Sequence, residues 1–122
     1  MNNNTLLLRQ IHPAFMQQDK ITSQAFRPTP KDEKLLSVDN GDKISAAEAW
    51  ARFIENPQCQ SAGVMAVSYQ ECTSETLNVI EDGTPYPEHC SIDFSDLSNG
   101  QINKKSKKLK SYAEKRDWIY KN

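Results

Sequence analysis

The apolar run S-A-G-V-M-A-V-S-Y at residues 61–69 constrains the fold most, because it is the most continuous apolar stretch in the chain. Strands that are covered on both faces read as continuous apolar runs, whereas strands with one wet face alternate. We therefore predict that residues 61–69 form a central strand. The chain has 122 residues, enough for one modest core, so we treat residues 1–122 as a single domain.

The clearest helix begins after Ser45. Ser45 and Glu48 have the spacing of a capping box, in which each side chain satisfies a backbone donor of the first turn. Apolar residues then recur at helical spacing, which predicts one buried stripe: Ala46, Ala49, Trp50, Phe53 and Ile54. The predicted helix ends near Glu55, and Trp50 and Phe53 are expected in the core.

Several short segments are predicted to be strands because β-compatible residues lie between turn-forming residues. These segments are residues 5–11, 21–26, 34–39, 77–80 and 90–94. Phe26 is assigned to the core, and Pro28 and Pro30 predict a rigid extended connector over residues 26–31.

A last helix is predicted over residues 101–116, capped by Asp96 or Ser98. Strands outnumber helices, and the first long helix lies between strands. The expected fold class is α+β: a small, mostly antiparallel sheet with one packed amphipathic helix and a basic C-terminal helix at its edge. Residues 1–4 are polar and expected to fray.

The net charge of −1 conceals a strong asymmetry along the chain. Residues 1–100 carry seven Lys or Arg against fourteen Asp or Glu, whereas residues 101–122 carry eight against two. Such a basic segment either folds onto its own acidic body or binds an anionic partner. We favour docking, with phosphate-backbone binding by nucleic acid as the alternative; its candidate residues are Lys104, Lys105, Lys107, Lys108 and Lys110.

Little in the sequence indicates a disulfide-rich, metal-binding, nucleotide-binding or membrane protein. The three cysteines are widely spaced and form no C-x-x-C pair, which argues against a disulfide framework and a metal site. The four glycines form no nucleotide-binding loop, and no cofactor is expected. No apolar run approaches the ~20 residues of a membrane helix, and no signal peptide is recognisable, so we expect a cytoplasmic protein without a membrane partner.

Polar residues near the prolines are the candidates for a site. Arg9, Arg27 and Lys31 are the candidate anion ligands. Ser23 would add a hydroxyl group, and His12 and His89 are candidates for proton transfer because imidazole titrates near neutral pH. The alternatives are that Arg9 is a strand-edge residue with a solvated tip, and that each histidine only hydrogen-bonds its loop.

Five short motifs, spread over nearly the whole chain, carry a resemblance to a group of small uncharacterised bacterial proteins. The motifs are R-x-x-H-P from Arg9, T-S-Q-A-F at 22–26, P-T-P-K-D at 28–32, L-S-V at 36–38 and P-E-H-C at 87–90. The resemblance implies a bacterial origin and no particular activity. Separately, the order of Arg9, Ser23 and the helix from Ser45 resembles that of ADP-ribosyltransferase-like domains, although the serine-threonine-serine signature is missing.

Two classes of function follow as expectations. The first is a small bacterial binding or accessory protein of a larger system, whose partner is another protein. The alternative is a compact enzyme or toxin that acts on a nucleotide-like, anionic substrate. An enzyme requires its polar groups to converge in a cleft, whereas an accessory protein can leave them scattered.

Overall fold

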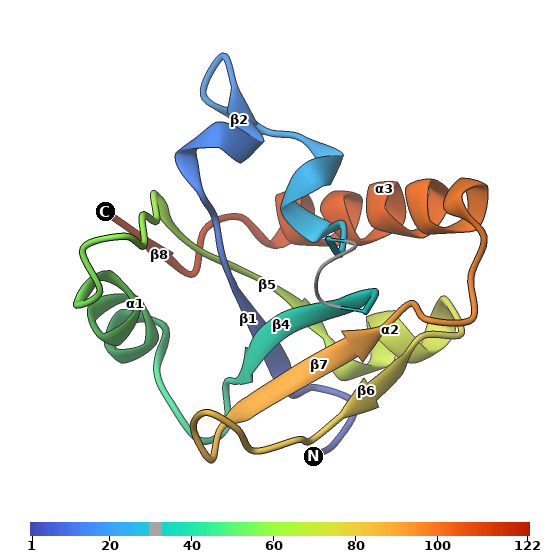
Figure 1. Ribbon diagram of the computed structural model, residues 1–122, viewed down its shortest axis with the longest axis horizontal. Coiled ribbons are helices and arrows are strands. Elements are labelled where there is room, and N and C mark those ends of the chain that lie inside the picture. The colour runs from blue at the N-terminus through green and yellow to red at the C-terminus, as the bar shows by residue number, and fades with distance from the viewer. Residues whose placement is uncertain (30–32) are drawn as a thin grey trace.

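The computed structural model describes residues 1–29 and 33–122, and within them a six-stranded antiparallel sheet forms the centre (Figure 1). The strand order is β6-β7-β4-β1-β5-β8. The strands are β1 (Leu6–Gln10), β4 (Leu35–Asn40), β5 (Gly63–Ser68), β6 (Asn78–Ile80), β7 (His89–Asp93) and β8 (Tyr120–Lys121), with a separate ribbon of β2 (Met16–Gln17) and β3 (Lys20–Ile21).

Three α-helices and two 3-10 turns surround the sheet in the described residues. They are α1 (Ala46–Ile54), α2 (Tyr69–Ser74), α3 (Asn99–Arg116), η1 (Pro13–Phe15) and η2 (Ser23–Phe26). The predicted α+β class, with its mostly antiparallel sheet, is confirmed. No helix in the described part of the chain is long and apolar enough to cross a membrane.

Capping boxes fix where the two longer helices begin. The Ser45 hydroxyl accepts from the Glu48 N–H (3.1 Å), and the Glu48 carboxylate accepts in return from the Ser45 N–H, as predicted. Ser98 and Gln101 repeat the arrangement at α3, so Ser98 is the cap and the helix begins two residues earlier than expected.

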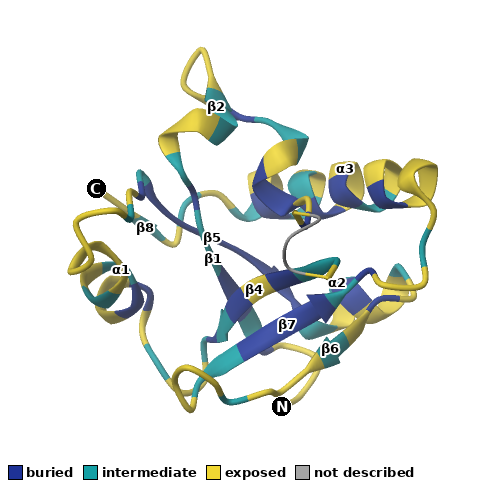
Figure 2. Ribbon diagram, viewed as in Figure 1, coloured by how far each residue is buried: buried dark blue, intermediate teal, exposed yellow. Residues whose placement is uncertain are grey.

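Strand β5 is buried at all six positions because helices cover both faces of the sheet there (Figure 2). On one face, Val64 and Ala66 pack against α1. On the other, Met65 and Val67 join the larger core beneath α3. The strand is not central in the sheet, since β8 is the edge strand beside it.

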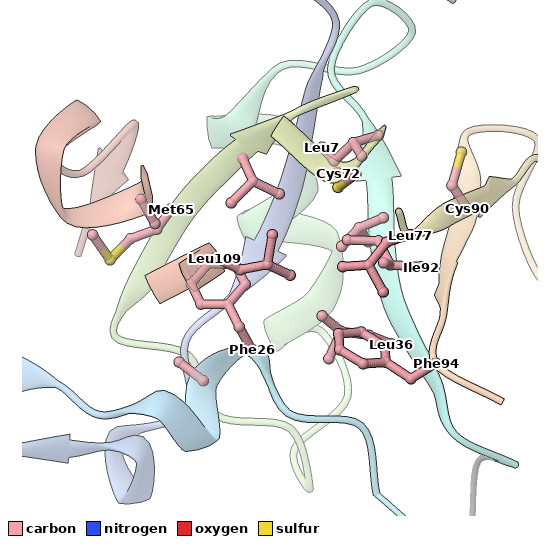
Figure 3. Packing of buried hydrophobic residues seen from close by; sticks show 14 of the residues in the cluster. Leu7, Phe26, Leu36, Met65, Cys72, Leu77, Cys90, Ile92, Phe94 and Leu109 are labelled. Carbon is pink, nitrogen blue, oxygen red and sulfur yellow. The ribbon is translucent and has the colours of Figure 1, made fainter. Parts of the chain in front are cut away.

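The larger core fills the space between the sheet, η2, α2 and α3. Figure 3 shows Phe26 of η2 near Leu109 of α3, with Ile92 and Phe94 of the β7 region beside them; all four are completely buried. The basic C-terminal helix is therefore part of the core and is docked on the body.

The strand predicted over residues 21–26 was wrong. Residues 21–26 form the end of β3 and the turn η2, in which the consecutive residues Ala25 and Phe26 are both fully buried. Alternation along a strand with one wet face does not bury two neighbours in this way.

Phe53 is 36% exposed, although it was expected in the core. The buried residues of α1 are the small Ala46 and Ala49, which let the helix approach the sheet closely. Trp50 is half-buried at the side of this contact, where its indole N–H donates to the Ser61 carbonyl (3.0 Å).

Candidate functional site

The candidate site lies on the half of the sheet that α1 leaves open, where polar residues of β4 and β7 share one face. In the antiparallel register, Ser37 pairs with Ser91 and Asp39 pairs with His89. Residues opposite each other or two apart point to the same face, so Ser37 and His89 are diagonal neighbours. The alternate residues of β4, Leu36 and Val38, face the larger core.

Asp82 reaches His89 because the chain after β6 continues beside β7. The Gly83 N–H donates to the His89 carbonyl (3.0 Å), which holds the two segments together. Asp82 Oδ1 lies 2.6 Å from His89 Nδ1, and Asp82 Oδ2 accepts from the Ser91 hydroxyl (2.7 Å). Partial burial alone would raise the pKa of Asp82, but the bonds from Ser91 and His89 outweigh it and hold the pKa below its usual value.

His89 links this carboxylate to a serine. Its Nε2 lies 3.1 Å from Ser37 Oγ, while Nδ1 faces Asp82. In the neutral imidazole, a proton on Nδ1 that is shared with Asp82 leaves Nε2 as the acceptor for the serine hydroxyl. The order carboxylate, imidazole, hydroxyl is that of a base-activated nucleophile.

Ser37 and His89 open on a cavity of about 550 Å³, which we call the Ser37 cavity. It lies between β1, β4, α1, η1 and the loop before β7. Most of its wall is apolar, which is usual for a small-molecule site. Its apolar lining includes Leu8, Phe15, Ala49, Phe53, Pro85 and Tyr86, and its polar lining includes Arg9, His12, Ser37, Asp39, Arg52 and His89.

Arg9 stands where β1 and β4 diverge. The two strands pair at only two positions, Leu7 with Asn40 and Leu8 with Asp39. Beyond these two pairs, the Arg9 guanidinium connects β1 to its neighbours: Nε donates to the Ala25 carbonyl (2.9 Å), and Nη1 donates to the Ser37 carbonyl of β4 (3.1 Å). Arg9 thus fixes the backbone of Ser37 at the cavity wall.

Arg52 of α1 pairs with two carboxylates at the other side of the cavity. It forms an ion pair with Asp39 (3.5 Å) and a second with Glu88, and its guanidinium lies 3.7 Å above the Tyr86 ring. Burial raises the pKa of Asp39, which the charges of Arg52 and His89 only partly oppose. With both carboxylates beside it, Arg52 brings little net positive charge to the cavity.

Of the residues singled out in the sequence, Arg9, His12 and His89 line the Ser37 cavity together. His12 caps η1, with its Nδ1 accepting from the Ala14 N–H (2.9 Å). The other candidates lie elsewhere or outside the described residues. Ser23 lines a separate hollow, Arg27 is exposed on extended backbone, and Lys31 lies outside the described residues, as does part of the proposed 26–31 connector.

The structure therefore does not bring Arg9 and Ser23 into one cavity, although the likeness to ADP-ribosyltransferase-like domains uses both residues.

Sequence reasoning missed Ser37, Asp82 and Asp39. Ser37 and Asp39 alternate with Leu36 and Val38, so period-two patterning marks them as residues of the less apolar face. Nothing local connects them to His89, which is 52 residues from Ser37.

Of the five lysines proposed for nucleic-acid binding, two have partners within the protein and three are exposed. Lys105 donates to the Glu75 carbonyl and Lys110 forms an ion pair with Glu114 (3.6 Å). Lys104, Lys107 and Lys108 are exposed on the outer side of α3.

Within residues 1–29 and 33–122, no three His, Cys, Asp or Glu side chains are grouped to hold a metal ion. No protein-family model matches the chain, and neither the curated proteins nor the solved structures contain a match.

Proposed function

We propose that the protein is a small esterase-type hydrolase in which Ser37 is the nucleophile. One observation carries the proposal: Asp82, His89 and Ser37 form a continuous chain of short contacts, 2.6 Å and 3.1 Å, whose last member opens on the Ser37 cavity. An activated serine needs a base within hydrogen-bond reach and a third group that orients the base. All three groups are present here.

In this proposal the Ser37 hydroxyl attacks the carbonyl carbon of an ester, and its proton passes to His89 Nε2. Asp82 holds the Nδ1 proton and stabilises the imidazolium that forms. The alcohol leaves with the proton from Nε2 as the C–O bond breaks. Water then attacks the acyl carbon while its proton passes to Nε2. The bond between the acyl carbon and Ser37 Oγ breaks, Oγ takes the proton back from Nε2, and the carboxylic acid is released.

The lining of the cavity supports an uncharged, largely apolar ester as the substrate. Phe15, Phe53 and Tyr86 contribute aromatic surface to the wall. The charge of Arg52 is offset by Asp39 and Glu88. For these reasons we prefer such an ester to the nucleotide-like anion considered from the sequence.

Hydrolysis of p-nitrophenyl esters with acyl chains of two to eight carbons tests the proposal. We expect Ser37→Ala and His89→Gln to lower kcat/KM by at least ~10²-fold, because each removes a member of one catalytic unit. Ser23→Ala is the matched control, since Ser23 lines a different hollow and its loss should leave the rate unchanged. Ester turnover that is equal in wild type and Ser37→Ala would contradict the proposal.

If wild type does not turn over the ester, the binding or accessory role expected from the sequence, with another protein as the partner, is the remaining proposal. We retain the cytoplasmic location as a proposal. It is supported by the three cysteines, all of them free thiols. A bacterial origin and a protein partner likewise remain proposals.

A further inference from the structure

Six of the basic residues in α3 fall into two sets, while Lys110 pairs with Glu114 of the same helix. One set is engaged with the body: Arg116 binds both carboxylate oxygens of Glu71 (2.8 and 3.1 Å), and Lys105 donates to the Glu75 carbonyl. The other set is exposed and forms no hydrogen bond or ion pair with any residue that the structure describes. Its members are Lys104, Lys107, Lys108 and Lys115.

Helical geometry places these four lysines, the outer lysines, on one face. Positions 104, 108 and 115 recur at intervals of four and seven residues, and 107 lies beside them. The buried residues Ile102, Leu109 and Ala113 occupy the opposite side of the helix. Figure 2 shows this division as a dark inner edge and a yellow outer edge of α3. At 1.5 Å per residue the stripe is about 16 Å long.

A hollow extends the basic surface past the helix. It has a volume of about 480 Å³ and lies between α3, the β2–β3 ribbon and η2. Lys20 and Lys107 contribute positive charge from its two sides, and the hydroxyl-bearing residues Ser23 and Ser111 line it. Cations and hydroxyl donors together are the usual ligands of phosphate oxygens.

We propose that the outer lysines and this hollow bind the phosphate backbone of double-stranded nucleic acid, independently of the chemistry at Ser37. Lysine stripes bind phosphates without reading the sequence. A single strand is disfavoured because α3 exposes no large aromatic residue on which bases stack. A membrane surface is disfavoured because an interfacial helix must insert its apolar face, and that of α3 is buried in the core.

Fluorescence anisotropy with a labelled 20-base-pair DNA duplex tests the proposal. Five phosphate contacts, one from each outer lysine and one from Lys20, predict a slope of log K against log salt of about −4.5, so affinity should fall about 500-fold between 50 and 200 mM KCl. The double variant Lys107→Gln/Lys108→Gln should bind more weakly, and its salt effect should shrink to about 40-fold.

The double variant Lys43→Gln/Lys121→Gln removes the same charge away from α3 and should behave as wild type. The proposal is overturned if the duplex does not bind at 50 mM KCl, or if both double variants weaken binding equally. It is also overturned if phosphatidylserine vesicles bind and the duplex does not, or if a single strand of the same length binds more tightly than the duplex.

Discussion

Replacing Leu109 by alanine is the sharpest test of how α3 is held. Leu109 is completely buried between α3 and the sheet, beside Phe26. The substitution removes three carbon atoms, worth about 2.4 kcal/mol of transfer free energy at ~0.8 kcal/mol per group. The cavity left in a core that cannot fully collapse adds to this, so we expect the free energy of unfolding to fall by about 3 kcal/mol.

Urea unfolding followed by tryptophan fluorescence measures this loss. With an m-value of about 1.5 kcal/mol/M, the midpoint should move down by about 2 M without a change in slope. Lys108→Ala, one residue away on the exposed side, is the control and should stay within about 0.5 kcal/mol of wild type. A loss below about 1 kcal/mol for Leu109→Ala would refute the docking of α3 as a structural element.

Two further predictions concern titratable groups. Partial burial alone would raise the pKa of Glu71, but the hydrogen bonds from Arg116 and Ser68 outweigh it and leave the pKa below its usual value of 4.5. The ionised Glu71 therefore stabilises the fold above pH 4.5, and this contribution is lost as the pH falls through the lowered pKa. Glu71→Gln keeps the capping pattern, so its melting temperature should fall less than that of wild type between pH 5 and pH 3, and parallel curves would contradict this. Burial raises the pKa of the Cys72 thiol to about 12 and that of the Cys90 thiol to about 11. Iodoacetamide at pH 8 should therefore modify only Cys59 in the folded chain, as mass spectrometry would show.

Much of the fold followed from local patterns. The Ser45 capping box predicted α1, and the apolar run at 61–69 predicted a strand; both are observed, although the strand lies beside the edge of the sheet and not at its centre. Local patterns failed where tertiary packing decides: Phe26 reaches the core from a 3-10 turn, and Phe53 stays exposed because α1 contacts the sheet through alanines.

The candidate site was less predictable, because it depends on strand register. His89 and Arg9 were recognisable as polar residues near turns, and both line the Ser37 cavity. Ser37 and Asp82 acquire their significance only when β4, β7 and the segment after β6 lie side by side. No short motif encodes that alignment, since Ser37 is 52 residues from His89 and Asp82 lies seven residues before it, on the other side of a turn.

Labelling with a fluorophosphonate probe tests the proposed nucleophile most directly, because such probes react with activated serine hydroxyls. We expect one adduct per chain, located at Ser37 by peptide mass spectrometry, and its loss in His89→Gln, in which the base 3.1 Å from Ser37 Oγ is removed. Ser23 should stay unmodified. An absence of adduct at Ser37, or equal labelling of wild type and His89→Gln, would contradict the role assigned to the Asp82–His89–Ser37 chain.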